Sequence, residues 1–322
     1  MSLPNEQDIR EWLADELNER QSDVTVYAVD LNRRYSRIFK AVAPALPHPV
    51  AVKVCLDADT SLPSHSSAAA QFDALNKAVN SLGPSCRLPQ PYGLLIERGC
   101  LVTEWIDGQS LDKLWWLWKR PSEIMAECKA AAKWLRNLHQ RGYVGQDHLN
   151  AAGWLRRLST DVGEARPEFK QSPVVRRALS VLFDSQNAAA SDSLAVSWVH
   201  GDFKPGNVVI WGRDITGLDL HLRHKDVGLR DISSFLFDLH LMAMEPAHLN
   251  LLPIERRLED AFLTEYFEGK PPFAAQWAKL HLALSAWTER EGETGYDLRK
   301  AFLCTRLKRV VSKVSDRIRA DL

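Results

Sequence analysis

Hydrophobic positions in the first third of the chain predict one helix followed by several strands. Four apolar residues recur at helical spacing near the N-terminus, namely Ile9, Trp12, Leu13 and Leu17. Segments 24–29, 35–42 and 50–54 are rich in β-branched and aromatic residues, which favours strands. A second helical pattern over residues 68–82 ends at Gly83-Pro84, and two apolar runs follow within 94–106. This part therefore predicts a small lobe rich in strands.

From Ser110 onward the pattern becomes mostly helical. The exception is residues 195–220, where short apolar runs alternate with Gly, Pro and Asn, as is typical of loops and hairpins. A change of pattern near Asp107-Gly108 marks the candidate boundary. The sequence thus predicts an α+β protein with lobes at residues 1–106 and 107–322.

The composition is that of an ordinary globular protein, and it argues against nucleic acid as a partner. Its 322 residues are 45% hydrophobic and 25% charged, which is enough to build two domains. The 41 basic residues balance 41 acidic ones, which argues against nucleic-acid binding through overall charge. No apolar run approaches the ~18 residues of a transmembrane helix, and residues 1–20 do not resemble a secretory signal.

The five cysteines are widely spaced and form no C-x-x-C pair, so the sequence indicates neither a zinc site nor a disulfide framework. Thiols packed as small hydrophobic residues suit a reducing compartment. We therefore expect a cytoplasmic protein.

The strongest chemical signal is the octapeptide His-Gly-Asp-Phe-Lys-Pro-Gly-Asn at 200–207. It resembles the kinase catalytic loop, H-R-D-x-x-x-x-N, with His200, Asp202 and Asn207 at the required spacing. The H-G-D form resembles the aminoglycoside phosphotransferase and choline kinase family, whose members are kinase-like and act on small molecules. The alternative interpretation is a polar turn with Asx capping.

This resemblance implies a bilobal protein-kinase-like fold, with a small antiparallel-sheet lobe followed by a larger helical lobe. It also implies an enzyme that transfers the γ-phosphate of ATP or GTP to a hydroxyl of a small molecule, such as a sugar or an amino alcohol. Phosphoryl transfer needs a carboxylate to accept the hydroxyl proton, and we assign Asp202. Lys204 either neutralises charge on the moving phosphoryl group or pairs with a neighbouring acid.

Oxygen ligands for Mg²⁺ are expected downstream of the base, because this ion prefers carboxylate, amide and phosphate oxygens. Asn207 is one candidate, and Asp219 stands where the family places its metal-binding aspartate, in Asp-Leu-His instead of Asp-Phe-Gly. Asp231 resembles the acid that supports the catalytic loop in the family, and it would also serve as a helix N-cap. We expect His200 and Asp231 to support the loop structurally.

Nucleotide-binding residues are expected upstream. The segment ending at Lys53 resembles the V-A-I-K strand, whose lysine holds the α- and β-phosphates. Gln71 stands where the family has an acidic partner for this lysine. Asp73 lies two residues further on, so both cannot face Lys53 from one helix. Residues 101–108 resemble the linker between lobes, in which the backbone of Glu104, Trp105 and Ile106 would bind the adenine edge.

The expected phosphate-covering loop, residues 31–37, contains no glycine. Its arginines, Arg33, Arg34 and Arg37, either supply positive charge to the phosphates or form a solvated turn. Together with Gln71, this departure keeps open a catalytically silent pseudokinase that serves as a binding module.

The acceptor is not specified by the sequence. Residues 218–221 resemble a segment of lipopolysaccharide-core or envelope sugar kinases, which gives a second candidate function. A protein kinase is less compatible, since only eleven residues separate Asp219 from Asp231 and no A-P-E motif occurs. Trp115, Trp116 and Trp118 form either a buried helix or an exposed aromatic surface. Glu289, Glu291 and Glu293 would either meet a cationic amine or belong to a solvated loop.

Overall fold

The structure is a computed structural model of the full chain. It describes residues 3–31, 35–57, 59–83, 86–114, 120–212, 214–222, 224–242, 252–292 and 298–322. Arg33, Arg34, Glu293 and the three tryptophans at 115, 116 and 118 lie outside these residues.

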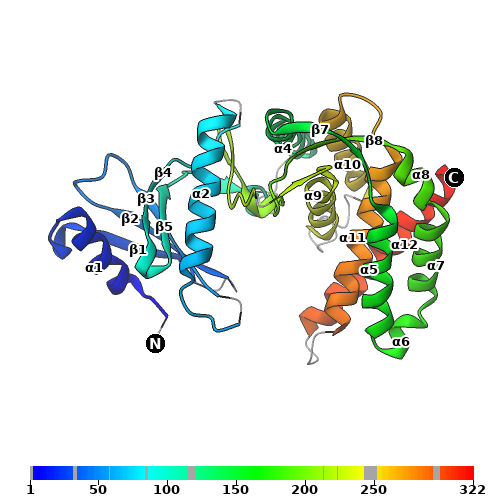
Figure 1. The fold of residues 1–322 in the computed structure, drawn as a ribbon, viewed down its shortest axis with the longest axis horizontal. Coiled ribbons are helices and arrows are strands. Elements are labelled where there is room, and N and C mark those ends of the chain that lie inside the picture. Colours follow the sequence, from blue (N-terminus) through cyan, green and yellow to red (C-terminus); the bar gives the residue numbers. More distant parts are fainter. Residues whose placement is uncertain are drawn as a thin grey trace. The chain divides into compact units, whose positions relative to one another are not determined.

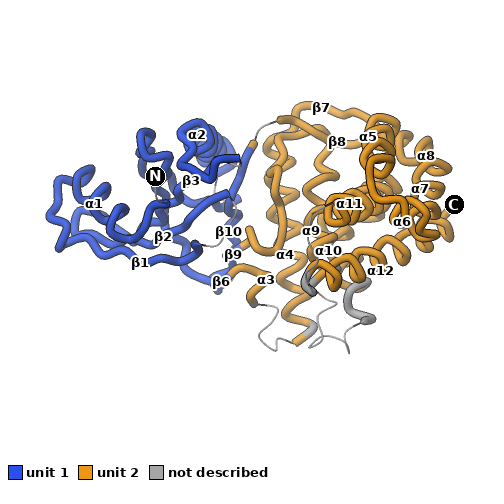
Figure 2. The backbone as a smooth tube through the Cα atoms, turned by 90° about the horizontal axis from the view of Figure 1, so that it is seen from below, with its two compact units in different colours: residues 1–109, 209–221 blue, residues 110–208, 222–322 orange. Residues whose placement is uncertain are grey.

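The chain forms two compact units, residues 1–109 with 209–221, and residues 110–208 with 222–322 (Figure 2). The elements of the first unit are α1 (Glu6–Leu17), η1 (Gln21–Asp23), β1 (Thr25–Asp30), β2 (Ser36–Val42), β3 (Val50–Cys55), α2 (His65–Leu82), β4 (Pro91–Leu95), η2 (Ile96–Arg98), β5 (Cys100–Glu104) and β10 (Asp214–Gly217). Two short strands, β6 (Gln109–Ser110) and β9 (Val208–Trp211), lie where the chain passes between the units.

The elements of the second unit are mainly helices: α3 (Leu111–Leu114), α4 (Pro121–Arg141), β7 (Tyr143–His148), α5 (Ala151–Glu164), α6 (Pro167–Lys170), α7 (Pro173–Asp184), α8 (Gln186–Ser191), β8 (Ser193–Trp198), η3 (Pro205–Asn207), β11 (Lys225–Asp226), α9 (Leu229–Met242), α10 (Leu252–Phe267), α11 (Phe273–Gly292) and α12 (Leu298–Asp321).

A five-stranded sheet in the order β1-β2-β3-β5-β4 forms the centre of the first unit, and every neighbouring pair is antiparallel. Alternate residues of β3, Val50, Val52 and Val54, join a core to which α1 contributes Ile9 and Leu13. The opposite face carries Lys53, and α2 covers part of it through Ala68. Figure 1 shows the sheet between α1 and α2.

Helix α11 is the central element of the second unit. Residues on all its sides are buried, including Trp277, Leu280 and Leu284, because α5, α8, α9 and α12 pack around it. The strand β7 pairs with β8, and helices α5 to α8 lie between them in sequence. The antiparallel sheet in one unit and the helices in the other confirm the predicted α+β class. Among the described residues, no helix is long and apolar enough to cross a membrane.

A buried ion pair stabilises the helices around α11. Lys279 Nζ lies 2.7 Å from Glu259 Oε2, and both side chains are only 1% exposed. Gln276 donates a hydrogen bond to Glu259 Oε1 over 2.7 Å, and Arg317 approaches the same oxygen at 3.2 Å. Glu259 thus has donors for both oxygens, which a buried carboxylate requires.

Candidate active site

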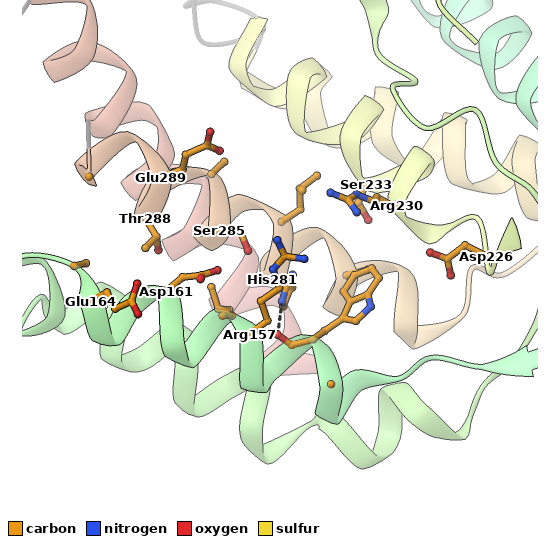
Figure 3. A pocket seen from close by; sticks show the side chains of 18 residues that line it. Arg157, Asp161, Glu164, Asp226, Arg230, Ser233, His281, Ser285, Thr288 and Glu289 are labelled. Atoms are coloured by element: carbon orange, nitrogen blue, oxygen red, sulfur yellow. Dashed lines mark hydrogen bonds between the residues drawn. The ribbon is translucent and has the colours of Figure 1, made fainter. Parts of the chain in front are cut away.

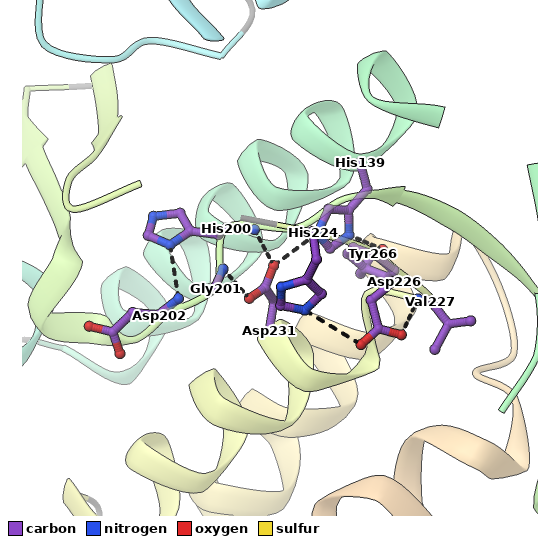
Figure 4. Close-up of polar contacts among 9 residues, drawn as sticks. All are labelled: His139, His200, Gly201, Asp202, His224, Asp226, Val227, Asp231 and Tyr266. Atoms are coloured by element: carbon purple, nitrogen blue, oxygen red, sulfur yellow. Dashed lines mark hydrogen bonds and ion pairs between the residues drawn. The ribbon is translucent and has the colours of Figure 1, made fainter. Parts of the chain in front are cut away.

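The predicted catalytic loop follows β8 in the second unit, and the carboxylate of Asp231 fixes its backbone (Figure 4). The N–H groups of His200 and Gly201 donate to the two oxygens of Asp231, over 2.6 Å and 2.9 Å. Gly201 has a φ of +87°, a conformation that favours glycine over other residues. The H-G-D order is therefore explained by local geometry: glycine allows the turn, and Asp231 anchors it from the first turn of α9.

Asp231 is itself held by His139, which in turn contacts Tyr266, and the sequence analysis assigned neither residue to the site. His139 Nε2 lies 3.1 Å from Asp231 Oδ2, and His139 Nδ1 lies 2.5 Å from the Tyr266 hydroxyl. An ionised carboxylate only accepts, so Nε2 carries the proton, and the Tyr266 hydroxyl donates to Nδ1. Burial opposes the ionisation of Asp231, but its hydrogen bonds with His139 and Gly201 outweigh it, so its pKa is lower than usual.

The carboxylate of Asp202 is held by two side chains of the same loop. Asn207 Nδ2 donates to Asp202 Oδ2 over 2.9 Å and to the backbone oxygen of Asp202 over 2.8 Å. Lys204 Nζ lies 2.8 Å from Asp202 Oδ2, with the two side chains 39% and 37% exposed. Asp202 is thus oriented and still accessible, which a proton acceptor for a bound hydroxyl must be.

Stacked aromatic rings pack against the predicted catalytic loop. Phe203 is fully buried and stacks on Trp134 of α4 at a centroid distance of 5.7 Å and on Phe235 of α9 at 5.2 Å. Phe235 in turn stacks on Phe262 of α10 at 4.6 Å. Offset aromatic pairs of this kind contribute beyond their buried area, so Phe203 ties the loop to three helices.

A further carboxylate near the loop was not found from the sequence. Burial raises the pKa of Asp238 on α9 to about 6 against an opposing effect of Lys204, and the charges of Asp202 and Asp112 act in the same direction as burial. Asp238 occurs in an apolar helix, and its sequence contains no signal for this placement. Asp238 therefore lies within electrostatic range of Asp202, Asp112 and Lys204.

The first unit brings together Lys53 and Asp219, which are far apart in sequence. Lys53 Nζ donates to Asp219 Oδ1 over 2.7 Å, and the side chains are 13% and 19% exposed. Asp219 has a φ of +57°, which is uncommon for a residue with a side chain. Among the described residues, neither Gln71 nor Asp73 makes a hydrogen bond or ion pair with Lys53. The roles of Lys53 and Gln71 toward a nucleotide stay predictions.

The predicted adenine-binding segment lies at the end of β5. The N–H groups of Glu104 and Trp105 donate to the backbone oxygens of Gln90 and Pro49, over 2.8 Å and 3.1 Å. Ile106 N–H has no hydrogen-bond acceptor among the residues that the structure describes. Of the three residues predicted to bind the adenine edge, only Ile106 therefore retains its backbone donor for a ligand.

In the predicted phosphate loop, the side chain of Arg37 donates a hydrogen bond to the backbone oxygen of Pro4 over 3.0 Å.

The proposed magnesium ligands have suitable donor chemistry. The Asn207 NH₂ group is occupied by Asp202, which leaves the amide oxygen as its donor atom for a cation, and Asp219 contributes a carboxylate. In the described part of the chain, no three His, Cys, Asp or Glu side chains form a metal-binding group on their own. Oxygen donors of this kind suit Mg²⁺, and the role of each residue as a metal ligand stays a prediction.

Comparison with known proteins identifies the family. The model of the phosphotransferase enzyme family, APH, matches residues 22–218, which is more than half of the chain. No curated protein gives a significant match to the sequence.

Several solved structures share the fold. A choline/ethanolamine kinase family protein from Mesorhizobium loti has a TM-score of 0.61 at 13% identity, covering 96% of this chain and 99% of its own. Choline kinase LicA from Streptococcus pneumoniae has a TM-score of 0.58 at 13% identity, covering 95% and 98%. Amicoumacin kinase hAmiN, in complex with AMP-PNP, Ca²⁺ and amicoumacin, has a TM-score of 0.56 at 12% identity, covering 92% and 89%.

These structures confirm the kinase-like fold, and the family match confirms the predicted resemblance. The chain therefore belongs to the APH phosphotransferase family, and it is an enzyme of the small-molecule kinase type.

Proposed function

We propose that this protein transfers the γ-phosphate of ATP or GTP to a hydroxyl group of a small molecule, with Asp202 as the base. The observation that carries the proposal is the arrangement of Asp202, whose carboxylate is oriented by Asn207 and Lys204 in a loop anchored by Asp231. A polar turn without catalytic function would not need a fixed and accessible carboxylate.

In the proposed step, the acceptor oxygen forms a bond to the γ-phosphorus while its proton passes to Asp202. The bond between the γ-phosphorus and the bridging oxygen breaks, and the nucleoside diphosphate leaves with the electron pair. Lys204 lies beside the base and would stabilise the negative charge of the moving phosphoryl group. His200 and Asp231 act as positioning residues for the loop.

In this proposal, Lys53 binds the phosphates of the nucleotide, and the segment 104–106 binds its adenine or guanine edge. Gln71, on α2 of the same unit, is the predicted partner of Lys53. Asn207 and Asp219 would be the ligands of Mg²⁺, which would supply positive charge to offset that of the phosphates. A cytoplasmic location is part of the proposal, because the nucleotide co-substrates occur there and four of the five free cysteines are buried as thiols.

The test is nucleotide-dependent transfer by the full chain. Diphosphate formation from Mg-ATP and Mg-GTP is measured with sugars, amino alcohols, aminoglycosides and hydroxy amino acids as acceptors. Asp202→Asn keeps the size of the side chain and removes the base, so we expect turnover to fall by about 100–10,000-fold. Asp184→Asn, an exposed residue of the same unit whose carboxylate accepts from Ser180, is the matched control and should retain full turnover. Undiminished turnover of Asp202→Asn would contradict the assignment of Asp202 as the base.

Envelope sugar kinase activity and a silent pseudokinase are outcomes of the same experiment. Selective phosphorylation of a lipopolysaccharide-core sugar would favour the first. Absence of any nucleotide binding or turnover would favour the second.

A further inference from the structure

The carboxylate of Asp231, which anchors the predicted catalytic loop, is enclosed in the second unit. Its side chain is only 2% exposed. Besides the two N–H groups of the loop, His139 Nε2 donates to it over 3.1 Å (Figure 4). A carboxylate that is removed from water stays ionised only if hydrogen-bond donors compensate its charge. Among the residues that the structure describes, His139 is the one side-chain donor to this carboxylate.

The first turn of α9 separates this carboxylate from open space. Arg230 and Ser233, on either side of Asp231 in the sequence, line a pocket of about 730 Å³ whose other walls come from α5 and α11 (Figure 3). Neither Asp231 nor any residue of the loop 200–207 lines this pocket. The ionisation and the orientation of Asp231 therefore depend on hydrogen bonds from protein groups.

The hydroxyl of Tyr266 determines which nitrogen of His139 carries the proton. The hydroxyl oxygen lies 2.5 Å from His139 Nδ1. Burial raises the pKa of Tyr266, and the charge of Asp231 acts in the same direction, so the phenol stays protonated. A protonated phenol donates to Nδ1, which leaves the proton of the neutral imidazole on Nε2, where it meets the carboxylate.

Two further contacts hold the imidazole and the phenol together. Gly228 has a φ of +70°, and a Cβ at this position would lie 2.8 Å from His139 Nδ1, so only glycine leaves room for the ring. Arg136, one turn before His139 on α4, donates to the backbone oxygen of Glu265. Helix α10 is thus attached to α4 directly beside Tyr266.

We propose that Tyr266 and His139 are positioning residues, which keep the base of the proposed phosphotransfer in place. The hydroxyl of Tyr266 fixes the imidazole, the imidazole fixes the carboxylate of Asp231, and this carboxylate holds the N–H groups of the two residues before Asp202. Both residues act through the loop and not on the substrate. The inference rests on the proposed function, because it concerns the same loop and the same base.

The first experiment removes the hydroxyl alone. Tyr266→Phe in the full chain keeps the ring, whose centroid lies 5.7 Å from that of His139 in an edge-to-face contact. Diphosphate formation from Mg-ATP and Mg-GTP is measured with sugars, amino alcohols and aminoglycosides as acceptors. We expect kcat to fall by about 10-fold, because a buried hydrogen bond is lost. KM for the nucleotide should change by less than about twofold, since neither residue is assigned to nucleotide binding.

A matched control variant is available in the same unit. Tyr143 of β7 is 53% exposed, so Tyr143→Phe makes the same chemical change away from the loop and should retain the kcat of the parent. The fraction of folded protein is determined by chemical denaturation for each preparation, and kcat is expressed per folded molecule. A lower stability of Tyr266→Phe with an unchanged kcat per folded molecule would overturn the proposal, because the tyrosine would then be merely structural.

Variants of the histidine separate hydrogen bonding from packing. His139→Leu removes the donor to Asp231 and should lower kcat by about 10–100-fold. His139→Gln has an amide N–H that can donate to the same carboxylate, so it should recover part of this loss. In the double variant Tyr266→Phe/His139→Leu, the loss should equal that of His139→Leu alone, because the hydroxyl acts only through the imidazole. Losses that multiply in the double variant would overturn the proposed chain of contacts.

Amide hydrogen exchange tests the same chain of contacts without catalysis. The N–H groups of His200 and Gly201 should exchange about 10-fold faster in Tyr266→Phe than in the parent, and at the parent rate in Tyr143→Phe. Faster exchange in a protein whose parent form transfers phosphate to no acceptor would contradict the proposed function and still support the positioning of the loop. Unchanged exchange at both amides in Tyr266→Phe and His139→Leu would overturn the inference.

Discussion

Two lysine–carboxylate pairs, one in each unit, have the same separation and very different surroundings. Lys53 lies 2.7 Å from Asp219, and Lys279 lies 2.7 Å from Glu259. The first pair is 13% and 19% exposed, whereas the second is only 1% exposed on each side and has Gln276 as an additional donor. An accessible pair can exchange its partner for phosphate and metal, whereas an enclosed pair with satisfied oxygens serves stability.

The Lys204–Asp202 pair is the most exposed of the three, at 39% and 37%, and belongs to the catalytic loop. We therefore propose that the exposure of a charged pair, rather than its distance, separates pairs with a chemical role from pairs that serve stability. The following variants test that distinction.

The largest effect is expected at the exposed end of this series. Asp202→Asn should lower turnover by about 100–10,000-fold while changing the free energy of unfolding by less than about 1 kcal/mol, because exposed pairs contribute little to stability. Turnover and chemical denaturation are measured on the same preparations. A large loss of stability with normal turnover in the folded fraction would reverse the assignment of this pair.

The enclosed pair should show the opposite behaviour. Lys279→Met leaves Glu259 buried without its main cation, which should destabilise the protein by about 3 kcal/mol. The matched variant Lys53→Met should cost less than Lys279→Met, because its pair is partly exposed, and should weaken nucleotide binding. Urea unfolding and nucleotide titration are compared for both variants. The double variant Lys279→Met/Glu259→Leu should recover much of the loss, and equal unfolding costs for Lys53→Met and Lys279→Met would refute the distinction.

Removal of the loop anchor should have an intermediate effect. Asp231→Ala leaves the N–H groups of His200 and Gly201 without their acceptor, which should cost about 1–3 kcal/mol. Turnover should fall as well, because Asp202 is then less well oriented. Asp231→Asn keeps one accepting oxygen and should recover part of both losses. If both variants behave like the parent in unfolding and turnover, Asp231 does not hold the loop.

The smallest effect depends on pH and concerns Asp238. Its pKa is raised to about 6, so the folded state binds a proton more readily than the unfolded state, and stability decreases as pH rises through this range. Asp238→Asn removes this penalty, so the variant should be more stable by about 1–2 kcal/mol above pH ~7 and similar to the parent near pH ~4. Thermal unfolding between these pH values measures the difference, with Asp184→Asn as control. A difference that does not change with pH would show that Asp238 does not titrate here.

The contacts within the predicted catalytic loop could be anticipated from the sequence because the interacting groups lie within eight residues. Lys204 and Asn207 both contact Asp202 in the structure, so a short motif is enough to bring these groups together. Strand β3 could also be predicted, since its segment is rich in β-branched residues, and Val50, Val52 and Val54 are buried on one face.

Other parts of the structure depend on contacts between residues far apart in the sequence, or show no hydrophobic pattern. The contact between His139 and Tyr266 joins α4 to α10, and no local signal links these helices. The sequence suggested Gln71 or Asp73 as neighbours of Lys53, whereas Asp219 fills that position from far along the chain. Strand β7 was not predicted because five of its six residues are exposed, so it shows no alternation of buried and exposed positions.

The central claim is that the partly exposed pair Lys53–Asp219 belongs to a metal–nucleotide site. Thermal unfolding of the parent and of Asp219→Asn, with and without Mg-ATP or Mg-GTP, tests it most directly. A nucleotide at a hundredfold its Kd should stabilise the parent by about 2.7 kcal/mol, which corresponds to a midpoint shift of roughly 5–10 °C. We predict this shift in the parent and its loss in Asp219→Asn. An equal shift in both proteins, or none in the parent with either nucleotide, would contradict the claim.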